Sequence, residues 1–86
     1  MQDLYTQTLD DGDIVFREED EGNCAYIVEM GSVVIWSHRD GDRIELAVIR
    51  PGSIFGEMSV IDNVPRSANA TARGKTRLRV VTAEHM

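Results

Sequence analysis

The residues best suited to chemistry lie close together, between Gly56 and Ala68. Arg66 carries a planar guanidinium that can donate two parallel hydrogen bonds to a phosphodiester, although a surface arginine in a turn is the ordinary alternative. Ser67 offers a hydroxyl donor, and the small side chain of Ala68 leaves its N–H open to a ligand. Glu57 is either a ligand-binding carboxylate or one that merely complements a helix dipole. These residue types at this spacing predict a binding site for a small anion.

A short helical turn is predicted inside this segment. Apolar residues at positions 58, 60 and 61 lie between Gly56 and the turn signal Asp62-Asn63, and this arrangement favours one turn of helix. The first N–H groups of such a turn have no partner within the helix, so they supply further donors for an anion. Gly56 either lets the backbone approach a ligand closely or acts as the hinge between strand and helix.

The rest of the chain is predicted to be β-structure that positions this segment. Short runs of β-forming residues are separated by turn signals about every 8–12 residues, which is typical of antiparallel sandwiches and barrels. About eight strands follow from this pattern. They are expected at residues 4–9, 14–17, 25–30, 32–38, 43–49, 53–55, 67–72 and 76–82.

Two turn signals and one alternating run bear most on the fold. Asp40-Gly41 is the strongest hairpin signal, because both residues accept positive φ. Gly31 interrupts an apolar stretch and predicts a bulge or a tight turn, where the chain would reverse between two strands. The clearest alternation predicts that one face of strand 43–49 packs on the core, through Ile44, Leu46 and Val48.

Length, charge and composition argue against several classes of function. Eighty-six residues fit one domain, and the net charge of −6 argues against binding to a nucleic-acid backbone. No apolar run approaches the roughly 20 residues of a membrane-spanning helix, and the N-terminus lacks a signal segment, so a cytoplasmic protein is expected. Cys24 is the only cysteine, and His38 and His85 are far apart in the sequence. We therefore expect no metal site and no catalytic cluster.

Residues 55–68 read FGEMSVIDNVPRSA, and this run resembles the phosphate-binding cassette of cyclic-nucleotide-binding domains. That family includes bacterial cAMP receptor regulators and kinase regulatory subunits. Phe-Gly-Glu, an apolar turn, a polar turn and Pro-Arg-Ser-Ala follow in the family's order, and further likeness lies at 12–16, at 25–28 with Gly31, and at 50–52. The resemblance implies a mainly β fold, an eight-stranded antiparallel jelly-roll barrel with one short helical turn in the cassette.

The same resemblance implies a function. The domain is expected to bind a cyclic purine mononucleotide, cAMP or cGMP, and to relay occupancy to an attached or separate effector in signal transduction. It is not expected to be an enzyme or to require a cofactor. Glu57 would accept a hydrogen bond from the ribose 2′-hydroxyl, and Ser67 does not decide between the two nucleotides. The implied ligand-binding residues are Gly56, Glu57, Met58, Ser59, Arg66, Ser67 and Ala68.

The chain also departs from the family pattern. Asn69 and Ala70 stand where a small hydroxyl residue and a β-branched residue are more usual. Family members continue into helices that cap the base, so residues 1–86 are expected to form a single domain, the β-barrel core without these helices. A homodimer through such helices is compatible with this pattern. The alternative is a divergent scaffold that binds no nucleotide and serves protein–protein contact, although such relatives usually lose the arginine or the glutamate.

Overall fold

The computed structural model describes residues 5–85, which form a mainly antiparallel β fold with one short α-helix. The predicted mainly β antiparallel fold and the helical turn are confirmed, but the described residues contain six strands instead of eight, and the sheet does not close into a barrel. In chain order the elements are β1 (Tyr5–Leu9), β2 (Ile14–Phe16), β3 (Cys24–Arg39), β4 (Asp42–Ile49), β5 (Ile54–Phe55), α1 (Glu57–Asp62), β6 (Asn69–Thr82) and a final 3-10 turn, η1 (Ala83–His85).

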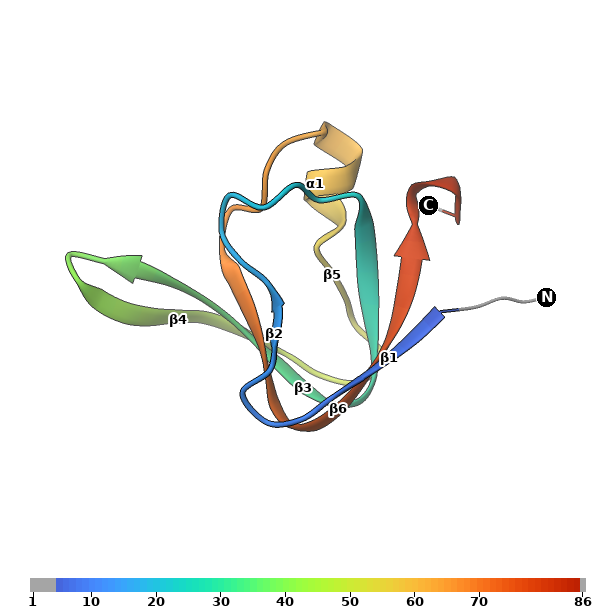
Figure 1. Cartoon of the computed structure of the whole chain (residues 1–86), viewed down its shortest axis with the longest axis horizontal. Coiled ribbons are helices and arrows are strands. Elements are labelled where there is room, and N and C mark those ends of the chain that lie inside the picture. Colours follow the sequence, from blue (N-terminus) through green and yellow to red (C-terminus); the bar gives the residue numbers. More distant parts are fainter. Residues whose placement is uncertain (1–4, 86) are drawn as a thin grey trace.

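Two long strands, β3 and β6, hold the molecule together. The strand order is β1-β6-β3-β4, with β2 paired to β6 and β5 paired to β3, and all pairs are antiparallel. Figure 1 shows this long pair bending through the body of the molecule, with α1 at the upper edge. The short strand β5 leads directly into residues 56–68, which carry the predicted site.

The expected chain reversal at Gly31 does not occur. Segments 25–30 and 32–38 are parts of the single strand β3, and most of 67–72 together with 76–82 belongs to β6. Gly31 has φ 82° and lies where the register shifts, because Met30 pairs with Arg77 whereas Ser32 pairs with Arg73. The positive φ thus produces a bulge, as predicted, but both strands bend there and continue without the expected reversal.

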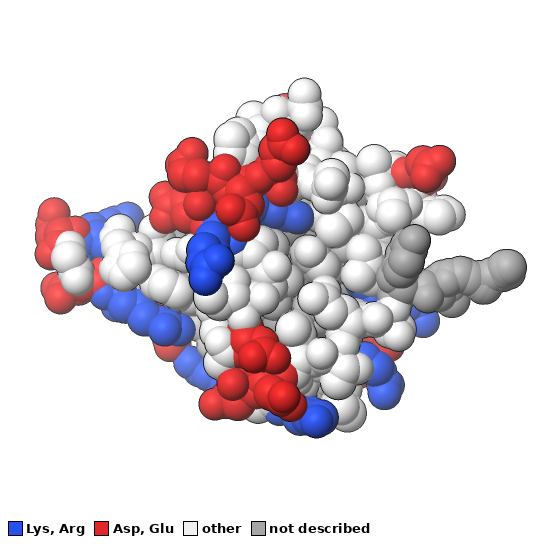
Figure 2. Space-filling view, viewed as in Figure 1, with Lys and Arg blue, Asp and Glu red and all other residues white. Residues whose placement is uncertain are grey.

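The hairpin of β3 and β4 projects from the rest of the sheet (Figure 1). Its turn is the predicted Asp40-Gly41, with φ of 54° and 86°. The predicted core face of β4 is wrong at two positions, since Ile44 is 37% exposed and Leu46 is 52% exposed. The tip of the hairpin is surrounded by charged side chains in Figure 2.

The core lies inside the bend of β3 and β6. An aromatic cluster forms its upper part, where the ring centroids of Tyr26 and Phe55 are 5.3 Å apart and those of Phe16 and Phe55 are 6.1 Å apart. The aliphatic part comprises Leu9, Val28, Val33, Ala70, Ala72 and Leu78. Because Phe16 ends β2 and Phe55 ends β5, this cluster fixes the two chain segments that border the predicted site.

No helix of the described residues is long and apolar enough to cross a membrane.

Candidate functional site

The helix α1 is a single compact turn with a left-handed residue at each end. Gly56 precedes it with φ 80°, and Asn63 follows it with φ 55°. The carbonyl of Ser59 accepts a hydrogen bond from the N–H of Val64 at 3.1 Å, which closes the turn. Ser59 is the buried residue of this helix. Residues 56–63 therefore form a rigid corner above the aromatic cluster.

Arg66 is turned inward beneath this corner and is only 3% exposed. Its Nη1 donates a hydrogen bond to the carbonyl of Gly56 at 2.6 Å, and its Nη2 donates one to the carbonyl of Cys24 at 2.6 Å. The guanidinium carbon lies 4.2 Å from the ring centroid of Phe16. These contacts fix the plane of the guanidinium.

No carboxylate in the described part of the chain pairs with this buried cation. None of the ion pairs found among residues 5–85 includes Arg66, and its buried Nε has no hydrogen-bond partner there. A buried charge without a counter-charge is costly, and proteins normally pair it. The carbonyl groups and the Phe16 ring stabilise the cation only in part. The arrangement therefore favours an anionic ligand as the missing partner.

All seven predicted site residues line one cavity of about 280 Å³, close to the lower end of the roughly 300–1,000 Å³ range of ligand pockets. Ser59, Arg66 and Ala68 are buried, Gly56 and Glu57 are half-buried, and Met58 and Ser67 are exposed. The other wall of the cavity is apolar and comprises Phe16, Ile35, Ile49, Ile54 and Phe55. The cavity thus has one cationic, hydrogen-bonding side and one apolar side.

No site role was predicted from the sequence for Phe16, Cys24 or Gly22, which lie against the Arg66 guanidinium. Phe16 and Cys24 lie 50 and 42 positions away along the chain, and neither carries a local signal for such a contact. Gly22 also has no predicted role in the site. A Cβ on Gly22 would lie 2.4 Å from the Cβ of Ser59 and 2.9 Å from both Nε and Cζ of Arg66, so the absence of a side chain at Gly22 allows the guanidinium to sit where it does.

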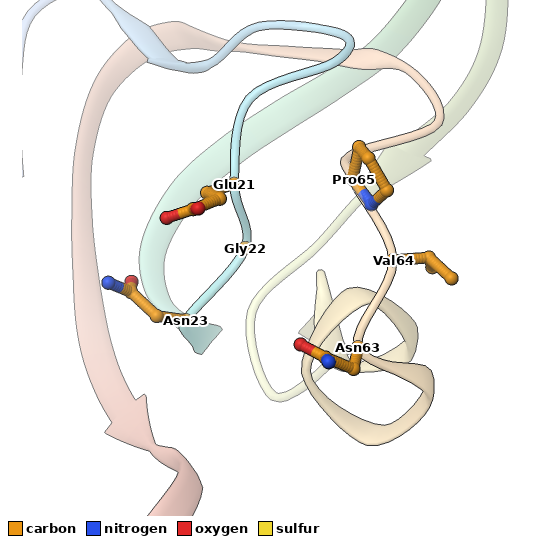
Figure 3. A pocket seen from close by; sticks show the side chains of 6 residues that line it. All are labelled: Glu21, Gly22, Asn23, Asn63, Val64 and Pro65. Carbon is orange, nitrogen blue, oxygen red and sulfur yellow. The ribbon is translucent and has the colours of Figure 1, made fainter.

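A second cavity lies between the β2–β3 loop and the segment that follows α1. Figure 3 shows residues 21–23 on one side of it and residues 63–65 on the other. Its volume is larger, about 380 Å³, but its lining contains no lysine or arginine: Glu21, Gly22, Asn23, Asn63, Val64 and Pro65. The smaller cavity is the better anion site because it contains the buried guanidinium.

Tyr26 lies under the site, and burial raises the pKa of its phenol from 10.0 to about 12, with a hydrogen bond to Cys24 adding to the rise and the nearby Arg66 charge opposing it. Burial favours the neutral phenol. The neutral Tyr26 phenol therefore makes its full contribution to the free energy of unfolding below pH 10. This contribution is lost as the pH rises through about 12. We expect ultraviolet difference titration of the parent against Tyr26→Phe to show this ionisation near pH 12. A Tyr26 transition near its ordinary value would contradict this placement.

Several known proteins have sequences that are similar to this chain. A family model described as the cyclic nucleotide-binding domain matches residues 6–86. The cyclic AMP receptor protein of Thermus thermophilus is 38% identical over 82 residues, which is 94% of this chain and 36% of the relative. A cAMP-dependent protein kinase regulatory subunit of Yarrowia lipolytica is 33% identical over 79 residues, covering 92% of this chain and 20% of the relative. The chain thus spans well under half of either protein.

Solved structures share the fold. The cAMP-bound form of the EAL enzyme Bd1971 superposes with a TM-score of 0.89 at 41% identity, covering 94% of this chain and 22% of that chain. The catabolite activator protein of Thermus thermophilus has a TM-score of 0.87 at 34% identity, covering 95% of this chain and 39% of that chain. The match over residues 6–86 and the shared fold show that this chain belongs to the cyclic-nucleotide-binding domain family.

Proposed function

We propose that this domain binds a cyclic purine mononucleotide, cAMP or cGMP, in the cavity of about 280 Å³ beside α1. The observation that carries the proposal is the buried Arg66 guanidinium, which has no carboxylate partner among the described residues. A cyclic phosphodiester carries one negative charge and oxygen acceptors that match a planar guanidinium. The ligand would therefore supply the counter-charge that the described residues lack.

The phosphate would lie against Arg66. A guanidinium has five N–H donors, and within residues 5–85 the Arg66 side chain donates two hydrogen bonds, both to carbonyls. One further N–H on each terminal nitrogen is therefore free to bind a phosphate oxygen. Ser67 is exposed at the cavity and would add its hydroxyl, while the backbone N–H groups at the start of α1 and at Ala68 would complete the cradle.

The ribose and base would occupy the rest of the cavity. Glu57 is half-buried at its edge, and its carboxylate would accept a hydrogen bond from the ribose 2′-hydroxyl. The apolar wall formed by Ile35, Ile49 and Ile54 would contact a flat purine. The size and polarity of the cavity are consistent with this placement.

A regulatory role follows from the same proposal. The relatives named above are a receptor protein and a kinase regulatory subunit, and forms of the EAL enzyme Bd1971 are described as cAMP-bound and cGMP-bound. Ligand binding shifts a conformational equilibrium only when the two states bind the ligand differently. We propose that occupancy of the Arg66 site moves α1 and that an effector, attached or separate, responds to that movement.

Thermal unfolding tests the proposed ligand directly. At 100 times the dissociation constant, a ligand that binds only the folded state stabilises it by about 2.7 kcal/mol. We expect cAMP or cGMP to raise the midpoint of unfolding, and adenosine, which lacks the phosphate, to have little effect. Unchanged midpoints with millimolar cAMP and cGMP would favour the scaffold alternative.

A further inference from the structure

The loop that connects β2 to β3 holds the main chain of Arg66. The N–H of Glu19 donates to the carbonyl of Arg66 at 2.8 Å, and the N–H of Arg66 donates to the carbonyl of Asp20 at 2.8 Å. Because the two bonds involve neighbouring residues of the loop, this pair resembles a bulge in an antiparallel ladder. The position of the Arg66 main chain therefore depends on where residues 19 and 20 are held.

The loop has little attachment of its own to the core. Residues 17–21 are exposed, and Figure 2 shows acidic side chains gathered over this connection. Its internal bonds are local, from the N–H of Arg17 to Oδ2 of Asp20 at 3.0 Å and from the N–H of Asp20 to the carbonyl of Arg17 at 3.1 Å. Glu19 has φ 77°, which is uncommon for a residue with a side chain. Because the loop has few contacts with the core, a hydrogen bond to the sheet is needed to hold it in place.

Asn69 at the start of β6 provides that anchor. Its Oδ1 accepts a hydrogen bond from the N–H of Glu18 at 2.9 Å, and its Nδ2 donates to the carbonyl of Trp36 at 3.4 Å. Asn69 is half-buried and pairs with Trp36 in the β3–β6 ladder. The only other side-chain link from Glu18 to the sheet among the described residues is an exposed hydrogen bond from Ser37, at 3.2 Å. The half-buried Asn69 amide is therefore the better protected of the two side-chain links between Glu18 and the long strand pair.

We propose that Asn69 is a positioning residue for Arg66 and acts through the loop without touching the ligand. Asn69 fixes Glu18, and residues 19 and 20 then fix the Arg66 main chain on both sides. A guanidinium held in place before the ligand arrives loses less freedom on binding, which strengthens binding. The effect on affinity rests on the proposed nucleotide function, whereas the effect on the loop does not.

Two variants on the same face of β6 separate positioning from general stability. Asn69→Ala removes the anchor, whereas Thr71→Val removes the hydroxyl that accepts a hydrogen bond from the Trp36 indole at 2.8 Å and leaves the loop untouched. In titration calorimetry with cAMP, we expect Asn69→Ala to bind about ten-fold more weakly than the parent and Thr71→Val to stay within about two-fold. Parent-like affinity for Asn69→Ala, or equal losses in both variants, would overturn the proposal.

Amide hydrogen exchange tests the positioning role of Asn69 in the absence of ligand. We expect Asn69→Ala to speed exchange at the amides of residues 18, 19 and 66, while Thr71→Val leaves them slow. Asn69→Asp should keep them slow because its carboxylate still accepts from the Glu18 N–H. If the parent binds neither nucleotide, the proposed function fails and exchange alone decides the role of Asn69. Unchanged protection in Asn69→Ala would then refute it.

Discussion

Arg66→Ala is expected to weaken cAMP binding by a few hundred-fold, equivalent to about 3–4 kcal/mol. The reason lies in the geometry of the buried guanidinium. Gly56, Cys24 and Phe16 already fix its plane, so its free N–H groups would meet the phosphate without further ordering. Without Arg66 the phosphate would lose its one buried cation and would remain poorly paired in a half-enclosed cavity. Titration calorimetry of the variant against the parent measures the loss.

Two further variants test whether the loss of affinity is specific to the Arg66 guanidinium. Arg66→Lys keeps a positive charge but loses the planar fork that binds both Gly56 and Cys24, so we expect most of the affinity to be lost as well. Arg79→Ala removes the same charge from the surface, where Arg79 pairs with Glu29 at 2.9 Å and its side chain is 49% exposed. We expect that control to bind within about two-fold of the parent. Equal affinities for Arg66→Ala and Arg79→Ala would rule out Arg66 as the phosphate ligand.

The candidate site was predictable because its chemistry is local. The helical turn and all seven implied ligand residues lie within residues 56–68, and the structure brings them to one cavity. The contacts that hold the Arg66 side chain in place could not be predicted. The carbonyl of Cys24 is a backbone atom that any residue would provide, and the space left by Gly22 matters only because Ser59 and Arg66 happen to fill it from the other side. Such contacts depend on how distant strands meet.

The errors in the fold have a similar origin. Alternation along residues 43–49 correctly indicated a strand, but it cannot show whether another element covers the apolar face, and Ile44 and Leu46 remain exposed. Apolar residues on each side of Gly31 fit both a reversal and a bulge. The choice between them depends on the opposite strand, which continues through its own positive-φ residue, Gly74, at 72°. Two bends that face each other keep β3 and β6 paired.

That paired bend predicts a large loss of stability for Gly31→Ala. A Cβ on Gly31 would lie 2.3 Å from the carbonyl oxygen of Lys75 and 2.6 Å from Oγ1 of Thr76, with φ at +82°. The first is a backbone atom of β6, between the paired residues Arg73 and Arg77. Thr76 is fully buried and donates a hydrogen bond to the carbonyl of Ser32 at 3.0 Å. Since neither atom can move without opening the β3–β6 pair, we expect the free energy of unfolding to fall by about 3 kcal/mol.

Gly41→Ala separates the two causes of that loss. Gly41 has nearly the same backbone conformation, φ +86°, but a Cβ there would meet nothing within 4 Å. It should therefore cost only the strain of a left-handed alanine, about 1 kcal/mol. Urea unfolding followed by Trp36 fluorescence measures both variants. A clear excess for Gly31→Ala would show that the contact with Lys75 and Thr76 demands glycine, and equal losses would mean that the strand pair relaxes around the added methyl group. Because β3 also supplies the Cys24 carbonyl that binds Arg66, weakening the bend is expected to loosen the site as well.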